Sequence, residues 1–146
     1  MMTALASGIW LIPWWARNGI LPGLVPPDQW RLAALLVADG CDRIGLWSRA
    51  SSLRDCISGE LVDEDRPDGA SLCEDLADEA MDLAFHQAHA FTALLETEAS
   101  AWAGEYRTGL EARREYTWDV GACAHSLFQM CHEYRMQHPV TRRTHR

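Results

Sequence analysis

Lysine is absent from this chain: all 13 basic residues are arginine, and asparagine occurs only at Asn18. We attribute both shortages to GC-rich codon usage and therefore expect a bacterial or phage origin. The net charge of −8 opposes non-specific binding to DNA. Binding to nucleic acid would also require a stripe of basic residues, and the arginines that could form one are scattered along the chain. These candidates are Arg107, Arg113, Arg114, Arg142, Arg143 and Arg146. We expect no direct contact with nucleic acid.

Several catalytic and cofactor-binding motifs are also missing. The chain has no Gly-x-Ser-x-Gly elbow and no glycine-rich loop after a strand, which argues against a serine hydrolase and against nucleotide-dependent chemistry. None of its five cysteines stands in Cys-x-x-Cys spacing, and none has a cation on the same predicted helix face that would lower the thiol pKa. We predict reduced, buried thiols in a reducing compartment and assign no catalytic residue and no cofactor.

A long hydrophobic run is missing as well. The apolar stretch at residues 8–12 has no basic segment before it, is broken by Pro13 and is followed by Arg17, so it is too short to span a bilayer. We therefore expect no membrane association and a cytoplasmic location.

The features that are present predict an all-α protein. The chain has 146 residues, 48% of them hydrophobic, with helical spacing and no convincing run of alternating strand residues. We predict a single domain over residues 1–146, folded as a compact helical bundle of about four to five helices. Residues 1–26 contain too many prolines and glycines for a long helix and should form an irregular arm rich in tryptophan and proline.

The first half of the chain contains two predicted helices. The first covers 27–39, with Pro27 in its first turn and Gly40 after its end. The second follows the apolar positions from Leu46 to Ile57 and ends at Gly59, although the Ser51-Ser52 pair could split it. Residues 59–70 are acidic and rich in helix breakers, which predicts a loop.

The second half contains the longest predicted helix. Ser71 and Glu74 match a capping box, and one apolar face follows. This face comprises Leu72, Leu76, Ala80, Leu83, Ala90 and Leu94. Whether residues 99–115 continue this helix stays open, because Gly104 and Gly109 weaken a helix without forbidding it.

The last predicted helix runs from about Tyr116 to Gln137, with Pro139 closing it and residues 139–146 forming a frayed basic tail. Its predicted core face comprises Val120, Ala124, Leu127, Cys131 and Tyr134.

Acidic residues are concentrated in the middle of the chain. Residues 55–98 hold thirteen of them against a single arginine, Arg66, whereas both flanking regions are slightly basic. Carboxylates on the predicted central helix are therefore candidates for contact with a basic surface on a partner. The candidates are Asp75, Asp78, Glu79 and Asp82.

Seven tryptophans are more than a four-helix core of this size needs, and tryptophan is enriched at interface hot spots. Core packing is the expected role of four of them: Trp30, Trp47, Trp102 and Trp118. The other three, Trp10, Trp14 and Trp15, lie in the irregular arm and are candidates either for packing or for contact with a protein partner.

The histidines offer an alternative. Asp82, His86 and His89 have i, i+4, i+7 spacing and could share a divalent transition metal, with His125 or His132 completing the site. A solvated acidic helix flank explains the same residues, because metal sites in helical bundles normally draw their ligands from several helices. Cys123 and Cys131 are poor partners for these histidines, because Cys123 points away from His125 on a helix and Cys131 faces the core while His132 does not.

Together these patterns favour a non-catalytic, acidic helical binding protein. We expect a regulator or inhibitor, comparable to antitoxin, immunity or anti-defence proteins, that docks on a basic surface of a larger protein or nucleoprotein complex. The alternatives are a metal-binding helical enzyme or sensor, and a small helical subunit of a larger assembly. No sequence feature predicts the oligomeric state.

Overall fold

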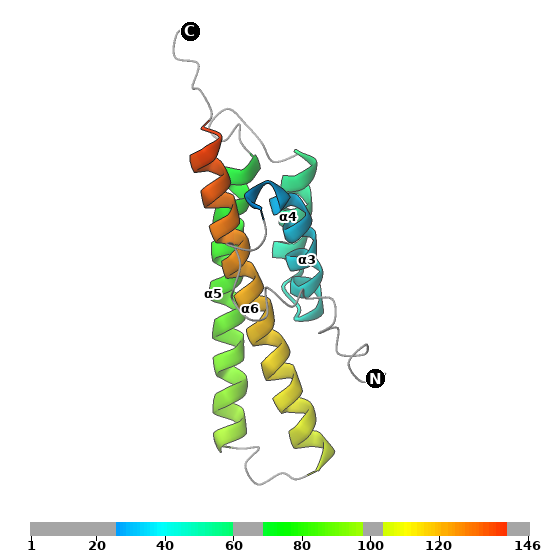
Figure 1. Cartoon of the computed structure of the whole chain (residues 1–146). Helices are drawn as coiled ribbons and strands as arrows, with labels where there is room; N and C mark the ends of the chain where they lie inside the picture. The colour runs from blue at the N-terminus through cyan, green and yellow to red at the C-terminus, as the bar shows by residue number, and fades with distance from the viewer. Residues whose placement is uncertain (1–25, 60–68, 98–103, 140–146) are drawn as a thin grey trace.

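A computed structural model describes residues 26–59, 69–97 and 104–139, and every regular element in these ranges is helical. A 3-10 turn, η2 (Pro27–Gln29), leads into α3 (Trp30–Arg43) and α4 (Trp47–Ser58). The two long helices are α5 (Gly69–Thr97) and α6 (Glu105–Gln137). The predicted all-α bundle is confirmed (Figure 1). Residues 1–25, 60–68, 98–103 and 140–146 are outside the described ranges, and with them most of the predicted arm, acidic loop and tail, as well as Trp102, whose predicted core position stays a prediction.

The four helices differ in length, and this difference shapes the molecule. At about 1.5 Å per residue, α5 and α6 are roughly twice as long as α3 and α4. The α3–α4 hairpin therefore packs along only one half of the antiparallel α5–α6 pair, and the other half projects beyond it (Figure 1). We call this projecting part, residues 88–97 and 105–115, the distal arm.

Helix α3 is longer at its C-terminal end than predicted. Gly40 does not end it, because the helix continues to Arg43 and the chain then turns at Gly45, which has a φ of 86°. Gly40 is instead buried against α6, where a β-carbon would lie 3.1 Å from Cγ2 of Val120. This glycine therefore allows two helices to approach closely, which is a role that its position in the sequence did not predict.

Helix α4 is continuous through Ser51 and Ser52 and ends as predicted at Gly59, which adopts a left-handed conformation. The predicted core position of Trp47 is wrong, because this residue is the first of the helix and its side chain is 71% exposed. Trp30, by contrast, is buried in the core as predicted.

Helix α5 differs from the prediction in its beginning and in its buried face. Ser71 lies inside the helix, so it does not cap it, and Glu74 instead accepts a hydrogen bond from Arg135. The buried positions are mostly small residues: Ala70, Cys73, Ala77, Ala80, Ala84 and Ala88, with Leu95 nearer the end. Of the predicted apolar face, Leu83 and Ala90 are exposed. Close packing of α5 against its neighbours selects small side chains, which a search for large apolar residues does not detect.

Helix α6 begins at Glu105 rather than near Tyr116, so residues 105–115 belong to this helix and not to α5. Its end at Gln137 agrees with the prediction. The predicted core face is confirmed: Val120, Ala124, Leu127 and Cys131 are buried, and Tyr134 packs against them. None of the described helices is long and apolar enough to cross a membrane.

Candidate docking surface

Three of the four candidate carboxylates point outward from α5. All four residues are exposed, but Glu79 lies toward α4, where its Oε1 is 3.0 Å from Nε of Arg49. The predicted acidic group therefore has two parts: Glu79, which forms an ion pair with Arg49 of α4, and a stripe of three aspartates that points outward. The spacing of the stripe, i, i+3, i+7, places its members on one helix face.

An aromatic cluster joins α5 and α6 beside this stripe. The Phe85 and Trp118 rings have centroids 4.9 Å apart, and His89 meets Trp118 edge to face at 5.1 Å. Phe85 lies directly over Gly121 of α6, where any β-carbon would overlap its ring. The cluster is therefore built on a glycine, and Trp118 remains 37% exposed above it.

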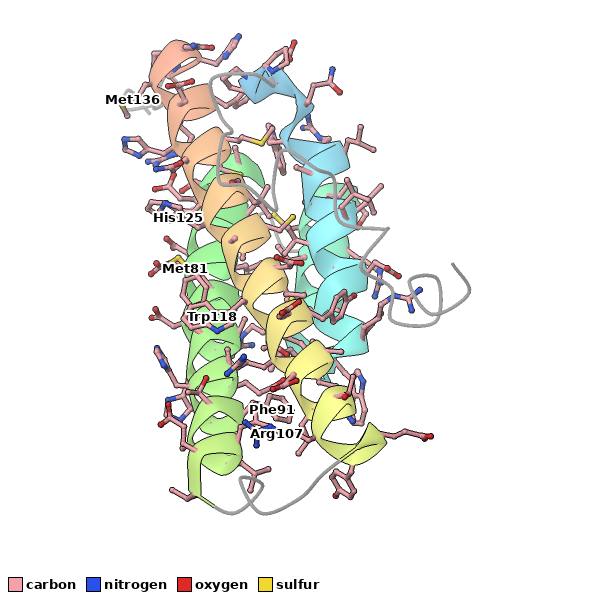
Figure 2. All side chains as sticks on the ribbon, turned by 60° about the horizontal axis from the view of Figure 1, so that its bottom comes forward. Met81, Phe91, Arg107, Trp118, His125 and Met136 are labelled. Carbon is pink, nitrogen blue, oxygen red and sulfur yellow. The ribbon has the colours of Figure 1, made fainter. Side chains whose placement is uncertain are left out.

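The acidic stripe and the aromatic cluster form one continuous surface. Phe85 follows Asp82 by three residues, and His89 follows it by seven, so all lie on the same face of α5. Figure 2 shows Trp118 on the side of the α5–α6 pair turned away from α3 and α4, together with Met81 and His125. We call this region the acid–aromatic surface and define it by Asp75, Asp78, Asp82, Phe85, His89 and Trp118.

The candidate metal ligands do not converge. Asp82, His86 and His89 are exposed on α5, and His125 and His132 are exposed on α6. Within the described ranges, no three His, Cys, Asp or Glu side chains form a group that could hold a metal ion. His132 instead lies 3.4 Å from Oε2 of Glu74, and His89 contacts Trp118.

The thiols do not form a reactive site. All five cysteines are reduced and buried. Burial raises the pKa of Cys41 and of Cys123 to about 12, and hydrogen bonding to Cys131 and Cys56 together with burial raises the pKa of Cys73. Because the thiolate is the nucleophile, raised pKa values argue against cysteine catalysis. Cys123 and Cys131 are buried while His125 and His132 are exposed, so these residues do not form a Cys/His site either.

The candidate nucleic-acid residues of α6 are partly engaged within the protein. Arg107 donates a hydrogen bond from Nη1 to the Leu95 carbonyl and pairs with Glu111, and Arg113 lies over the Phe91 ring. Arg142, Arg143 and Arg146 lie outside the described residues. So do Trp10, Trp14 and Trp15, and for all six residues the sequence-based interpretation stays a prediction.

Sequence reasoning missed two parts of this region. Trp118 was assigned to the core, and Phe85 was not singled out, because their meeting depends on Gly121 lying opposite Phe85 on another helix. The ion pair between Glu74 and Arg135, with Nη1 and Oε1 2.6 Å apart, joins residues 61 positions apart and leaves no local signal. The pair fixes the N-terminal part of α5 to the C-terminal part of α6.

Comparisons with protein-family models, with curated proteins and with solved structures returned no match.

Proposed function

We propose that this protein is a non-catalytic binding protein, a regulator or inhibitor, that docks through the acid–aromatic surface on a basic surface of a larger protein or nucleoprotein complex. The observation that supports this proposal is the continuity of exposed carboxylates with an exposed tryptophan on one side of the α5–α6 pair. Small antitoxin, immunity and anti-defence proteins are the functional classes that fit such a surface.

The chemistry of the surface specifies the chemistry of the partner. Trp118 has a supported ring that exposes 37% of its surface, and such rings frequently contribute much of the binding energy at interfaces. Asp75, Asp78 and Asp82 would form an acidic rim beside it, which attracts arginine and lysine side chains and accelerates association. The expected partner surface therefore has an apolar centre that receives Trp118 and a basic rim.

The rigidity of the surface favours binding. Phe85 is fixed over Gly121, and its ring supports Trp118, so little conformational freedom remains to be lost when a partner binds. The outer stripe is part of α5, whose opposite face is buried in the bundle. A preformed surface of this kind differs from a segment that folds on binding.

The first experiment identifies a partner by affinity capture from the native host and mass spectrometry, followed by kinetic measurements on the purified pair. We expect the D75N/D78N/D82N variant to associate more slowly than the wild type and to show a weaker dependence on salt. The matched control is E96Q/E105Q/E115Q, which removes the same charge from exposed positions outside the surface. If the two variants slow association equally, the effect comes from the net charge of the protein and not from the acid–aromatic surface, and the proposed docking surface is wrong.

A second variant tests the aromatic part. We expect W118A to weaken binding by about 2 kcal/mol or more, mainly through faster dissociation, because interface tryptophans are frequent hot spots. Trp47 is the control, because it is more exposed than Trp118 and lies outside the acid–aromatic surface. A W47A variant that weakened binding as much as W118A would place the interface elsewhere.

A permanent subunit of a larger assembly is the second candidate function, and a specific observation favours it. Leu32 and Leu35 of α3 are 57% and 47% exposed, and Met136 of α6 is 61% exposed. Leu32 and Leu35 are three residues apart and share one face of α3, and neighbouring exposed apolar side chains are more typical of an interaction site than isolated ones are. A purified chain that is monomeric and resists aggregation would contradict this alternative, whereas a transient regulator must behave in that way.

A further inference from the structure

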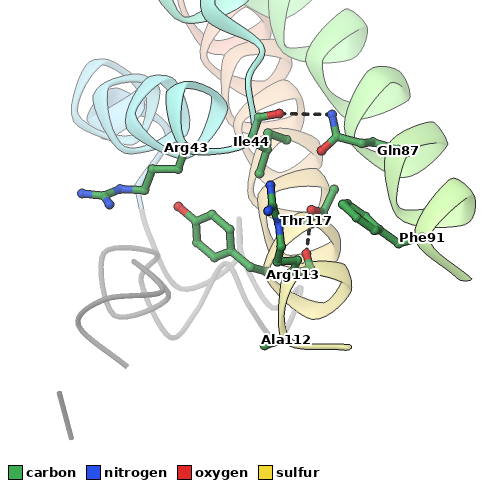
Figure 3. Close-up of a pocket in the computed structure, with 8 residues that line it drawn as sticks. Arg43, Ile44, Gln87, Phe91, Ala112, Arg113 and Thr117 are labelled. Atoms are coloured by element: carbon green, nitrogen blue, oxygen red, sulfur yellow. Dashed lines mark hydrogen bonds between the residues drawn. The ribbon is translucent and has the colours of Figure 1, made fainter. Parts of the chain in front are cut away.

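A cavity of about 380 Å³ lies where the α3–α4 turn meets the distal arm (Figure 3). Its walls come from three separate parts of the chain. Ile44 lies in the turn after α3, Phe91 is on α5, and Tyr116 and Arg113 are on α6. Phe91 follows His89 by two residues and therefore points to the opposite side of α5. The cavity is thus distinct from the acid–aromatic surface.

Most polar groups in the cavity wall are already engaged. Gln87 donates a hydrogen bond from Nε2 to the Ile44 carbonyl at 3.1 Å, which ties the α3–α4 turn to α5. The Thr117 hydroxyl donates to the Arg113 carbonyl at 2.7 Å. Arg43 pairs with Asp39 and directs its guanidinium away from Arg113, so it contributes mainly its aliphatic stem (Figure 3). These groups support the cavity but have limited capacity for a ligand.

The Arg113 guanidinium and the Tyr116 hydroxyl are the exceptions, because the buried Tyr116 oxygen has no hydrogen-bond partner among the described residues. The Arg113 guanidinium lies over the Phe91 ring, with its Cζ 5.7 Å from the ring centroid. Among the residues that the structure describes, no carboxylate lines the cavity, although the chain as a whole carries a net charge of −8. A guanidinium presents several N–H donors in a planar fork that matches carboxylate and phosphate groups. The cavity therefore offers one guanidinium and one hydroxyl beside the apolar surfaces of Ile44 and Phe91.

We propose that this cavity binds a small organic anion, with its carboxylate or phosphate head on Arg113 and its short apolar body against Ile44, Phe91 and Tyr116. The volume is within the range of small-molecule sites, and the combination of apolar side chains with a few polar groups is their usual composition. Burial raises the pKa of Tyr116, so its phenol stays neutral and adds no repulsive charge to the wall. The ligand would join the α3–α4 turn to the distal arm, because residues from both line the site.

The experiment measures chemical-shift changes of the purified chain with three probes: benzoate, phenyl phosphate and benzamide. Benzoate and benzamide have nearly the same shape, so their difference isolates the charge of the head group. We expect one of the anions to shift the amides of Phe91 and Thr117 with a Kd of ~1 mM, and benzamide to bind at least about tenfold more weakly. The stronger of the two anions identifies the head group.

The variant R113Q should weaken binding of the preferred anion by at least about tenfold, which corresponds to the loss of a charge-assisted hydrogen bond. The neighbouring R114Q is the matched control, because Arg114 does not line the cavity. A melting temperature for R113Q close to that of the wild type excludes general unfolding. The proposal is overturned if neither anion causes shifts at ~10 mM, if benzamide binds equally well, or if R113Q and R114Q behave alike. Partner binding through the acid–aromatic surface should be unchanged in R113Q, so the two proposals can fail separately.

Discussion

Helices α5 and α6 pass through two environments, one under the α3–α4 hairpin and one in the distal arm. In the covered half, many buried positions of both helices hold small residues, such as Ala77, Ala80 and Ala84 of α5 and Gly121 and Ala124 of α6. In the distal arm, the corresponding positions hold Phe91, Leu95 and Leu110. Small contact residues allow four helices to approach closely, whereas two helices alone need large side chains to bury comparable apolar surface.

The arm also uses arginine differently from the covered half. Arg107 and Arg113 lay their apolar stems and guanidinium groups over the arm, toward the Leu95 carbonyl and the Phe91 ring. Long basic side chains cover apolar surface in this way while their charges stay in contact with water. In the covered half, the α3–α4 hairpin performs this shielding with apolar contacts. We infer that the covered half carries most of the folding stability and that the arm unfolds locally at lower free energy.

The largest expected effect concerns alkaline stability of the covered half, which contains all five cysteines. The pKa of Cys41 and of Cys123 is raised from 9.0 to about 12 in the folded protein. Between these values the unfolded chain loses protons that the folded protein keeps. The free energy of unfolding should therefore be unaffected below pH 9 and fall as pH rises toward 12, by about 1.4 kcal/mol per pH unit for each thiol.

Urea unfolding at a series of pH values measures this dependence. The C41A/C123A variant is the control, because it removes both titrations, and its alkaline slope should be shallower than that of the wild type even if its stability near neutrality is lower. Tyr116 and Cys73, whose pKa values are also raised in the folded protein, should preserve part of the slope in both proteins. Parallel pH curves for the two proteins would refute this explanation.

The second prediction compares two glycines of α6. A β-carbon at Gly121 would overlap the Phe85 ring, whereas nothing lies within 4 Å of one at Gly109 in the distal arm. We expect G121A to lower the free energy of unfolding by about 1 to 3 kcal/mol through overpacking. We expect G109A to raise it by about 0.5 to 1 kcal/mol, because alanine is the better helix former.

Chemical denaturation of both variants checks the signs, and tryptophan fluorescence of G121A should report displacement of Phe85 from Trp118. A stable G121A with unchanged fluorescence would show that α5 and α6 are less closely packed than the structure indicates. If G109A is destabilised instead, the glycine must stabilise the arm in a way that the open space around Gly109 does not explain.

The smallest expected effect concerns local unfolding of the arm. We expect amides of 88–95 to be protected from hydrogen exchange at least about tenfold less than those of 77–84, equivalent to about 1.4 kcal/mol. A matched comparison within α6 uses 110–115 against 123–130, so that helix ends are excluded. Equal protection in both pairs would mean that the arm and the covered half unfold as one cooperative unit. If an organic anion binds in the cavity, adding it should reduce the difference in hydrogen-exchange protection between the distal arm and the covered half.

The sequence predicted the parts of this fold that depend on local patterns. The helical period, the end of α4 at Gly59, the end of α6 at Gln137 and the core face of α6 all follow from residues within a few turns of one another. The charge stripe on α5 was visible for the same reason, because i, i+4 spacing specifies a helix face without knowledge of the neighbours. Predictions that depended on which other helix packs against a given helix face, such as the core positions of Trp47 and Trp118, were wrong.

Local pattern determined that this chain is helical and where most of its acidic side chains lie along it, because backbone hydrogen bonding and side-chain spacing act over a few residues. Only the tertiary structure decided that most buried positions of α5 hold alanine, that Trp47 is exposed, and that Gly121 supports Phe85 and Trp118. It also brought Arg113, Phe91 and Ile44 around one cavity. These outcomes depend on contacts between residues far apart in the chain, whose energies are set by the close packing of helices and not by any local preference.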